Sequence, residues 1–145
     1  MKARKPRSDS TTAALFAIEN ARKPPPAPPA HVKLRDSDKP YWDSIIAARA
    51  RDEWTPVSLV LAAQLARCQS DIEIEQATLT VEGNVIDNKV NPRATVIDVL
   101  AKRQMALMRS LRMAGTALGK TPTIENNRRM ERSYSEAGFD DLIAR

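Results

Sequence analysis

The sequence predicts an all-α protein built around a long antiparallel helical hairpin, with short helices in a helix-turn-helix-like arrangement before it. Aromatic residues make up only 4% of a chain that is 42% hydrophobic, so the core must be aliphatic, and such a composition favours helices over strands. Two long segments each carry a single apolar stripe at helical spacing. Both segments begin with a polar residue followed by proline, which marks the start of a helix.

Residues 1–36 differ from the rest of the chain in charge and in proline content. Residues 1–35 carry eight Lys and Arg against two acids, whereas residues 36–145 carry fifteen against sixteen. The run PPPAPPA at 24–30 cannot be helical and is typical of an extended polyproline II spacer. We therefore expect a disordered basic arm, with at most a short helix at 13–18. Such an arm suits a polyanion such as DNA, but its charge fits a solubilising tail equally well. The arm cations are Lys2, Arg4, Lys5, Arg7, Lys33 and Arg35.

The helical part of the chain begins near residue 37. An apolar pattern around Trp42 predicts a first helix that runs to about residue 50. Thr55-Pro56 then begins a helix whose apolar stripe extends over about six turns, and we expect this helix to end at Gly83 because glycine accepts a positive φ. Residues 80–90 fit either a short β-hairpin or an extended connection.

Asn91-Pro92 begins the second long helix, which we expect to end at Gly115. The two long helices should pack as an antiparallel hairpin over residues 56–116. Because two helices and one shorter helix bury little surface, we expect this hairpin to be an oligomerisation core, although a compact three-helix monomer also fits the pattern. The apolar residues assigned to that core are Leu61, Leu65, Ile72, Leu79, Ile97, Leu100, Leu107 and Leu111.

The sequence carries no pattern typical of a catalytic or metal site. His31 is the sole histidine and lies beside the proline run, while Cys68 is the sole cysteine and lies on an apolar stripe, where a buried thiol is expected. The sequence does not contain the glycine patterns of phosphate-binding or dinucleotide-binding loops. We therefore expect a protein that is not an enzyme and uses no cofactor and no metal. The lone cysteine and the lack of an apolar run as long as a membrane span indicate the cytosol.

Several segments occur in an order found in one protein family. PYWDSIIAAR contains a tryptophan and is followed by a Thr-Pro helix start in EWTPVSLVLAAQLARC. A glycine-containing connection leads to the Asn-Pro start in EGNVIDNKVNPRATVIDVLAKRQMALMRSLRM, and then come LGKTP and the basic NNRRMER. Over about residues 38–132 the chain resembles the small terminase subunits of tailed bacteriophages, in particular the P27-like group. It departs from their pattern at Lys120, where Gly-Leu-Thr-Pro would be expected.

The resemblance implies a non-enzymatic role in viral genome packaging in the host cytoplasm. Small terminase subunits bind double-stranded viral DNA at the packaging start site and regulate the large terminase subunit, which carries the ATPase and the nuclease. They assemble as closed homo-oligomeric rings, here of roughly eight to ten copies with about nine favoured. Carried over, residues 37–67 are the candidate DNA-binding helices. Their candidate cations are Lys39, Arg49, Arg51 and Arg67, each of which also fits an ordinary surface charge.

The C-terminal part, residues 117–145, combines a basic segment with a short tail. In the tail, apolar side chains are interleaved with acids, which is typical of a peptide that folds on a partner such as the large subunit, although a disordered tail fits as well. The candidate docking residues are Tyr134, Phe139, Leu142 and Ile143.

Two other classes of function stay open at this point. One is a transcriptional regulator that uses residues 40–50 and 55–67 as a helix-turn-helix. The other is a virion or scaffold protein that binds no DNA.

Overall fold

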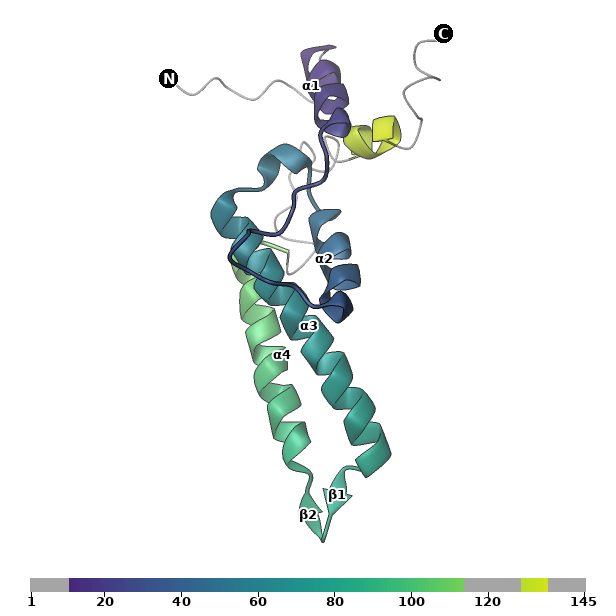
Figure 1. Ribbon diagram of the computed structural model, residues 1–145, viewed down its shortest axis with the longest axis vertical. Helices are drawn as coiled ribbons and strands as arrows, with labels where there is room; N and C mark the ends of the chain where they lie inside the picture. The colour runs from purple at the N-terminus through teal and green to yellow at the C-terminus, as the bar shows by residue number, and fades with distance from the viewer. Residues whose placement is uncertain (1–10, 114–128, 136–145) are drawn as a thin grey trace. The chain divides into compact units, whose positions relative to one another are not determined.

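The computed structural model describes residues 11–113 and 129–135, and these residues are mostly helical, as the sequence predicts (Figure 1). The chain divides into two compact units, which are described separately. One unit comprises Pro28–Ile45 and Pro56–Gly115; the other comprises Met1–Ala27, Ile46–Thr55 and Thr116–Arg145. The described elements are the helices α1 (Thr11–Arg22), α2 (Lys39–Ile46), α3 (Pro56–Glu82), α4 (Pro92–Ser110) and a helix at 129–135, the 3-10 turns η1 (Asp36–Asp38) and η2 (Arg51–Glu53), and the strands β1 (Val85–Ile86) and β2 (Lys89–Val90).

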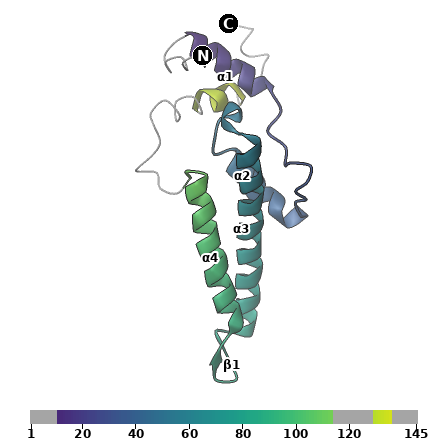
Figure 2. The same ribbon diagram turned by 90° about the vertical axis from the view of Figure 1, so that its left-hand side faces the viewer.

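Helices α3 and α4 form the predicted antiparallel hairpin and lie side by side (Figures 1 and 2). Helix α3 begins at Pro56 and ends just before Gly83, whose φ of 86° lies in the left-handed region. The Gly83 N–H donates to the Leu79 carbonyl at 2.8 Å. At the start of α4, the Asn91 side chain accepts a 3.0 Å hydrogen bond from the backbone N–H of Arg93. The predicted helix starts and the predicted end at Gly83 are therefore confirmed.

A β-hairpin joins the two helices, which decides between the two alternatives for residues 80–90. Val85 pairs with Val90 and Ile86 with Lys89 in an antiparallel ladder. The two turn residues, Asp87 and Asn88, have φ values of 51° and 59°. Positive φ at both central positions is the signature of a type I′ turn, and Asp and Asn tolerate it better than most residues do.

The predicted end of α4 at Gly115 is wrong, because the helix already ends at Ser110. Arg112 adopts a φ of 53° and its N–H donates to the Arg109 carbonyl, while the Met113 N–H donates to the Met108 carbonyl at 2.8 Å. This pair of hydrogen bonds is a Schellman motif. Glycine is the usual residue at the left-handed position, so an arginine there gives no signal in the sequence.

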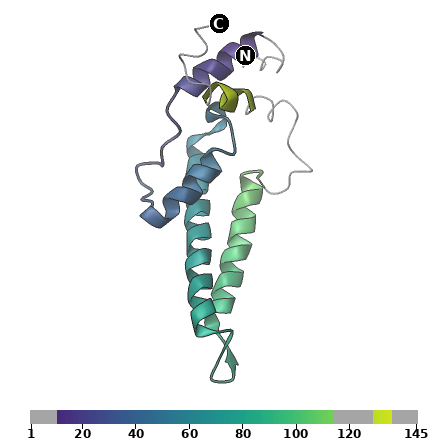
Figure 3. The same cartoon turned by 90° about the vertical axis from the view of Figure 1, so that its right-hand side faces the viewer.

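The core of the hairpin unit lies in the half of the hairpin that is remote from the β-turn. Helix α2 runs beside this half of α3 (Figures 1 and 3), and its Trp42 and Ile45 are buried. Cys68 is a buried core thiol, as predicted; its Sγ lies 3.2 Å from the Leu100 carbonyl oxygen, and burial raises its pKa. The other buried residues are Ala62, Ala63, Leu65, Ala66 and Ser70 in α3, Leu107 in α4, and Leu111 directly after α4. Small alanine side chains let neighbouring segments approach α3 closely.

Helix α2 ends at Ile46, earlier than the predicted end near residue 50. The buried Trp54 indole N–H donates to the Ile46 carbonyl at 3.2 Å, and the Arg49 backbone N–H donates to the same carbonyl at 3.4 Å. Within the segment expected to be a disordered arm, residues 11–22 form helix α1. Its Ala13, Ala17 and Asn20 are buried and recur at a spacing of four and three, so one face of α1 packs within its unit.

Candidate nucleic-acid interface and assembly surface

The cations expected to contact DNA fall into several structural settings. Lys2, Arg4, Lys5 and Arg7 lie outside the described residues. Lys33 is exposed, and its backbone carbonyl accepts a hydrogen bond from the guanidinium of Arg67. The exposed Lys39 pairs with Asp36 at 2.6 Å. Such exposed pairs contribute little to stability and leave the lysine available to other anions.

Arg35 joins two segments of the hairpin unit, which is the unit of Pro28–Ile45 and Pro56–Gly115, through ion pairs and hydrogen bonds. Its Nη2 lies 2.8 Å from Asp38 Oδ1 and 2.6 Å from Asp71 Oδ1, and its Nε also donates to Asp38. The Arg35 backbone N–H donates a further 2.8 Å bond to Asp38. Asp71 belongs to α3, so the guanidinium ties η1 to that helix.

In the other unit, the two predicted cations are also engaged within the chain. The Arg49 guanidinium lies 5.3 Å from the centroid of the Trp54 ring, within the range of a cation–π contact. Arg51 donates to the carbonyls of Asn20 and Ala21 in the last turn of α1 and to the carbonyl of Lys23, which directly follows the helix. A guanidinium at this end also complements the negative pole of the helix dipole.

Arg51 also links α1 to the helix at 129–135. Its backbone N–H lies 3.2 Å from a Glu131 carboxylate oxygen and its Nε lies 3.5 Å from the other. Burial raises the pKa of the Glu131 carboxyl. Tyr134, the one described residue among the predicted docking residues, is half-buried on the same helix; Phe139, Leu142 and Ile143 lie outside the described residues.

Helix α4 carries a set of exposed cations that the sequence analysis missed. Lys102 and Arg109 are seven residues apart and therefore share one helix face, and Arg103 lies on the neighbouring face. With Arg112, these side chains are exposed and form no ion pair with any residue that the structure describes. The seven-residue spacing of Lys102 and Arg109 could have revealed this cationic face. A count of charges in each segment does not show which face of a helix the charges occupy.

The residues predicted to form the oligomerisation core face the inside of one chain. Leu65, Leu107 and Leu111 are buried without any second copy, Leu65 to 1% exposure. The others, Leu61, Ile72, Leu79, Ile97 and Leu100, are half-buried in the hairpin. Most of the surface of these side chains is already buried within one hairpin. Their role in assembly stays a prediction.

The half of the hairpin that ends in the β-turn exposes apolar side chains instead. In the fully described stretch from Asp71 to Ala106, Asn91 is the only buried residue. Val81 is 88% exposed and Val99 is 59% exposed. Further exposed apolar residues here are Ile74, Val85, Ile86, Val90 and Val96. A two-helix ribbon with no buried apolar residue lacks the packing that stabilises most helices in proteins.

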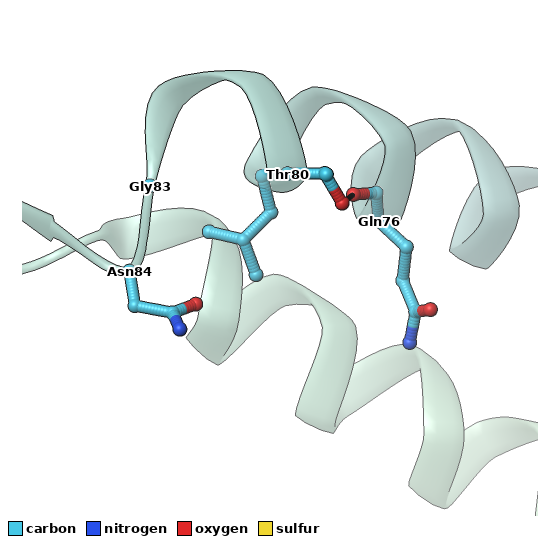
Figure 4. Close-up of a pocket in the computed structure, with 5 residues that line it drawn as sticks. Gln76, Thr80, Gly83 and Asn84 are labelled. Carbon is cyan, nitrogen blue, oxygen red and sulfur yellow. Dashed lines mark hydrogen bonds between the residues drawn. The ribbon is translucent and has the colours of Figure 1, made fainter.

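A shallow recess opens near the end of α3 (Figure 4). Gln76, Leu79, Thr80, Gly83 and Asn84 line it, and the Thr80 hydroxyl donates to the Gln76 carbonyl at 2.8 Å. These side chains offer amides, a hydroxyl and methyl groups but no acid or base. In the described part of the chain, His, Cys, Asp and Glu side chains form no cluster that could hold a metal ion. None of the described helices is long and apolar enough to cross a membrane.

Comparison with known proteins places the chain in a family. All of residues 1–145 match the model of the Hendrixvirinae small terminase family. The chain is similar to the terminase small subunit of Enterobacteria phage HK97, with 37% identity over 79 residues that cover 54% of this chain and 49% of the relative. The match thus spans about half the length of that relative. On the whole-chain match, and in agreement with the order of its sequence motifs, this protein belongs to the Hendrixvirinae small terminase family.

Proposed function

We propose that this protein is the DNA-binding, regulatory small subunit of a phage terminase, acting in the host cytoplasm without catalytic activity of its own. It binds double-stranded viral DNA at the packaging start site, assembles with copies of itself as a ring, and regulates the large subunit's ATPase and nuclease. The observation that carries the proposal is the hairpin unit, which combines exposed cations on α4 with a half whose apolar surface is uncovered.

The distribution of cations supports DNA binding by α4 together with the basic arm. Lys102 and Arg109 lie about 10 Å apart along one face of a regular helix. Exposed Lys and Arg side chains on such a face can contact phosphates along a duplex, because phosphate oxygens accept hydrogen bonds from Lys and Arg. Arg35 and Arg51, in contrast, use their guanidinium groups for contacts within the chain. We therefore assign Lys102 and Arg109, and not Arg35 or Arg51, as the principal described phosphate contacts.

The connection between α2 and α3 argues against the transcriptional-regulator alternative. A helix-turn-helix joins its two helices by a turn of three or four residues. Here α2 ends at Ile46 and α3 begins at Pro56, and the residues between them include the 3-10 turn η2. This connection is too long for that recognition motif.

Two measurements on the full-length protein test the proposal. Native mass spectrometry should find a closed multimer. Filter binding should find tighter binding to a duplex from the packaging start region of the viral genome than to a shuffled duplex of equal length and composition. A monomer or dimer, with equal affinity for the two duplexes, would contradict the proposal.

A further inference from the structure

One face of α3 is covered in its first half and bare in its second half. The face begins with Ala63, Ala66 and Ser70, all buried. It continues at helical spacing through Ile74, Ala77 and Val81, all exposed. The covering ends at η1, which Arg35 ties to Asp71. We call Glu73, Ile74, Ala77 and Val81 the α3 stripe.

Helix α4 carries a second bare stripe of similar make-up. Val96, Val99 and Arg103 follow at a spacing of three and four, so they share a face, and all three are exposed. We call them the α4 stripe. In both stripes a valine lies nearest the β-turn and a charged residue lies farther from it. On α3 these are Val81 and Glu73, eight residues apart, and on α4 they are Val96 and Arg103, seven residues apart.

Helix α3 is net acidic and helix α4 is net basic. The α4 stripe of a second copy therefore complements the α3 stripe in charge. Helix α3 has Asp71, Glu73, Glu75 and Glu82 against Arg67, whereas α4 has Arg93, Lys102, Arg103 and Arg109 against Asp98. Within the chain, Arg93 neutralises Glu75 and Glu82 at 2.8 Å each, and Arg35 neutralises Asp71. Glu73 and Arg103 form no ion pair with any described residue, although each borders an exposed apolar stripe.

We propose that the α3 stripe of one copy packs antiparallel against the α4 stripe of the next copy, head to tail, with Glu73 facing Arg103. Placing Val81 opposite Val96 brings the two charges to the same level, because the stripes run in opposite directions. Such a contact joins two different surfaces, so every copy keeps one free stripe for a further neighbour and the assembly can close as a ring. The inference rests on the proposed self-assembly and specifies its surface.

The register of this contact differs from the register inside one hairpin. There Arg93 meets both Glu75 and Glu82, and Asn91 also meets Glu82, so Val81 lies near the first turn of α4 and closer to the β-turn than Val96 does. Pairing Val81 with Val96 therefore shifts the neighbour along the helix axis relative to the register inside one hairpin. In a closed ring this shift requires hairpins that are inclined to the ring axis.

Charge reversal tests the contact. Glu73→Arg and Arg103→Glu should each raise the protein concentration needed for half-assembly by about tenfold or more, because like charges then face each other. The double variant should return to the wild-type concentration. Mixing the two single variants in equal amounts should restore assembly into open oligomers and even-numbered rings, in which the variants alternate, since the introduced arginine of one variant then meets the introduced glutamate of the other. Asp43→Arg, at an exposed acid of α2, is the matched control and should assemble like the wild type.

Native mass spectrometry measures assembly, and circular dichroism at the same concentration checks that each variant keeps its helices. Wild-type assembly by both single variants would overturn the proposed contact while leaving self-assembly intact. Rescue in the double variant with no multimer of any size in the mixture would also overturn it, because the two residues would then interact within one chain. A wild-type protein that stays monomeric would instead remove the proposed function itself.

Discussion

Arg35 binds Asp38 through three side-chain hydrogen bonds of 2.8 to 3.1 Å, and it also donates from its own backbone N–H. The Asp38 side chain has no exposed surface, whereas that of Arg35 is half exposed. The same guanidinium reaches Asp71, so a single arginine fixes the segment before α2 to the middle of α3. It also marks the point on α3 beyond which its apolar face is bare.

This arrangement predicts a particular dependence of stability on pH. Burial by itself would raise the pKa of the Asp38 carboxyl, but the hydrogen bonds from Arg35 hold that pKa below its ordinary value. The stabilisation is therefore present above the unfolded-state pKa of about 4 and is lost as the pH falls through the lower folded-state pKa. Asp38→Asn should lower the free energy of unfolding at pH 7 by about 2 kcal/mol and should lose less on acidification. Urea unfolding at pH 7 and pH 3 measures both; equal acid losses in the two proteins would refute the assignment.

Leu65 should be a determinant of folding, and not only of assembly. With 1% of its surface exposed within one chain, Leu65→Ala should cost about 2–5 kcal/mol of unfolding free energy. Val57→Ala, in the first turn of the same helix, is the matched control and should change stability by less than about 0.5 kcal/mol, because Val57 is 72% exposed. Denaturant titrations followed by circular dichroism compare the two, and similar losses would count against this core.

Arg51 should act through the end of α1. Arg51→Ala removes the donors to the Asn20 and Ala21 carbonyls and one partner of the buried Glu131. Amide hydrogen exchange should therefore become faster in α1, while α3 keeps its protection. Lysine has a single side-chain nitrogen and cannot contact the α1 carbonyls and Glu131 together, as Nη1 and Nε of arginine do, so Arg51→Lys should recover little of the loss. Unchanged exchange in α1 for Arg51→Ala would show that the cap is dispensable.

Arg112→Gly should separate stability from DNA binding. A non-glycine residue in the left-handed region costs about 1 kcal/mol, so glycine should raise the free energy of unfolding by up to about that amount. The same substitution removes an exposed cation and should weaken binding to duplex DNA at low salt. Thermal unfolding and filter binding report the two effects, and a less stable variant would contradict the cap geometry.

The sequence predicted those features that depend on local chemistry. Asn91-Pro92 and Gly83 act through their own side chains and backbone angles, so the start of α4 and the end of α3 were recognisable. The early end of α4 was not, because Arg112 occupies a position at which only glycine or asparagine would give a signal. The early end of α2 was not recognisable either, because the Trp54 indole that bonds to the Ile46 carbonyl lies outside the helix, further along the chain.

The candidate site was harder to predict because periodicity shows which face is apolar but not what covers it. Leu65 and Val81 both belong to apolar patterns of α3, yet one is buried within the chain and the other is bare. Cations raise the same difficulty. Arg51 and Arg109 are equivalent in a count of charges, but one caps α1 and the other remains exposed.

The central claim, that exposed cations of α4 contact duplex DNA, is tested most directly by the salt dependence of binding. For Lys102→Gln, Arg109→Gln and their combination, the slope of log K against log salt should decrease by about 0.9 for each phosphate that the variant no longer neutralises. Lys89→Gln removes an exposed cation from β2 and should keep the wild-type slope. If the combined variant and Lys89→Gln both retain the wild-type slope and affinity, α4 does not contact the DNA backbone.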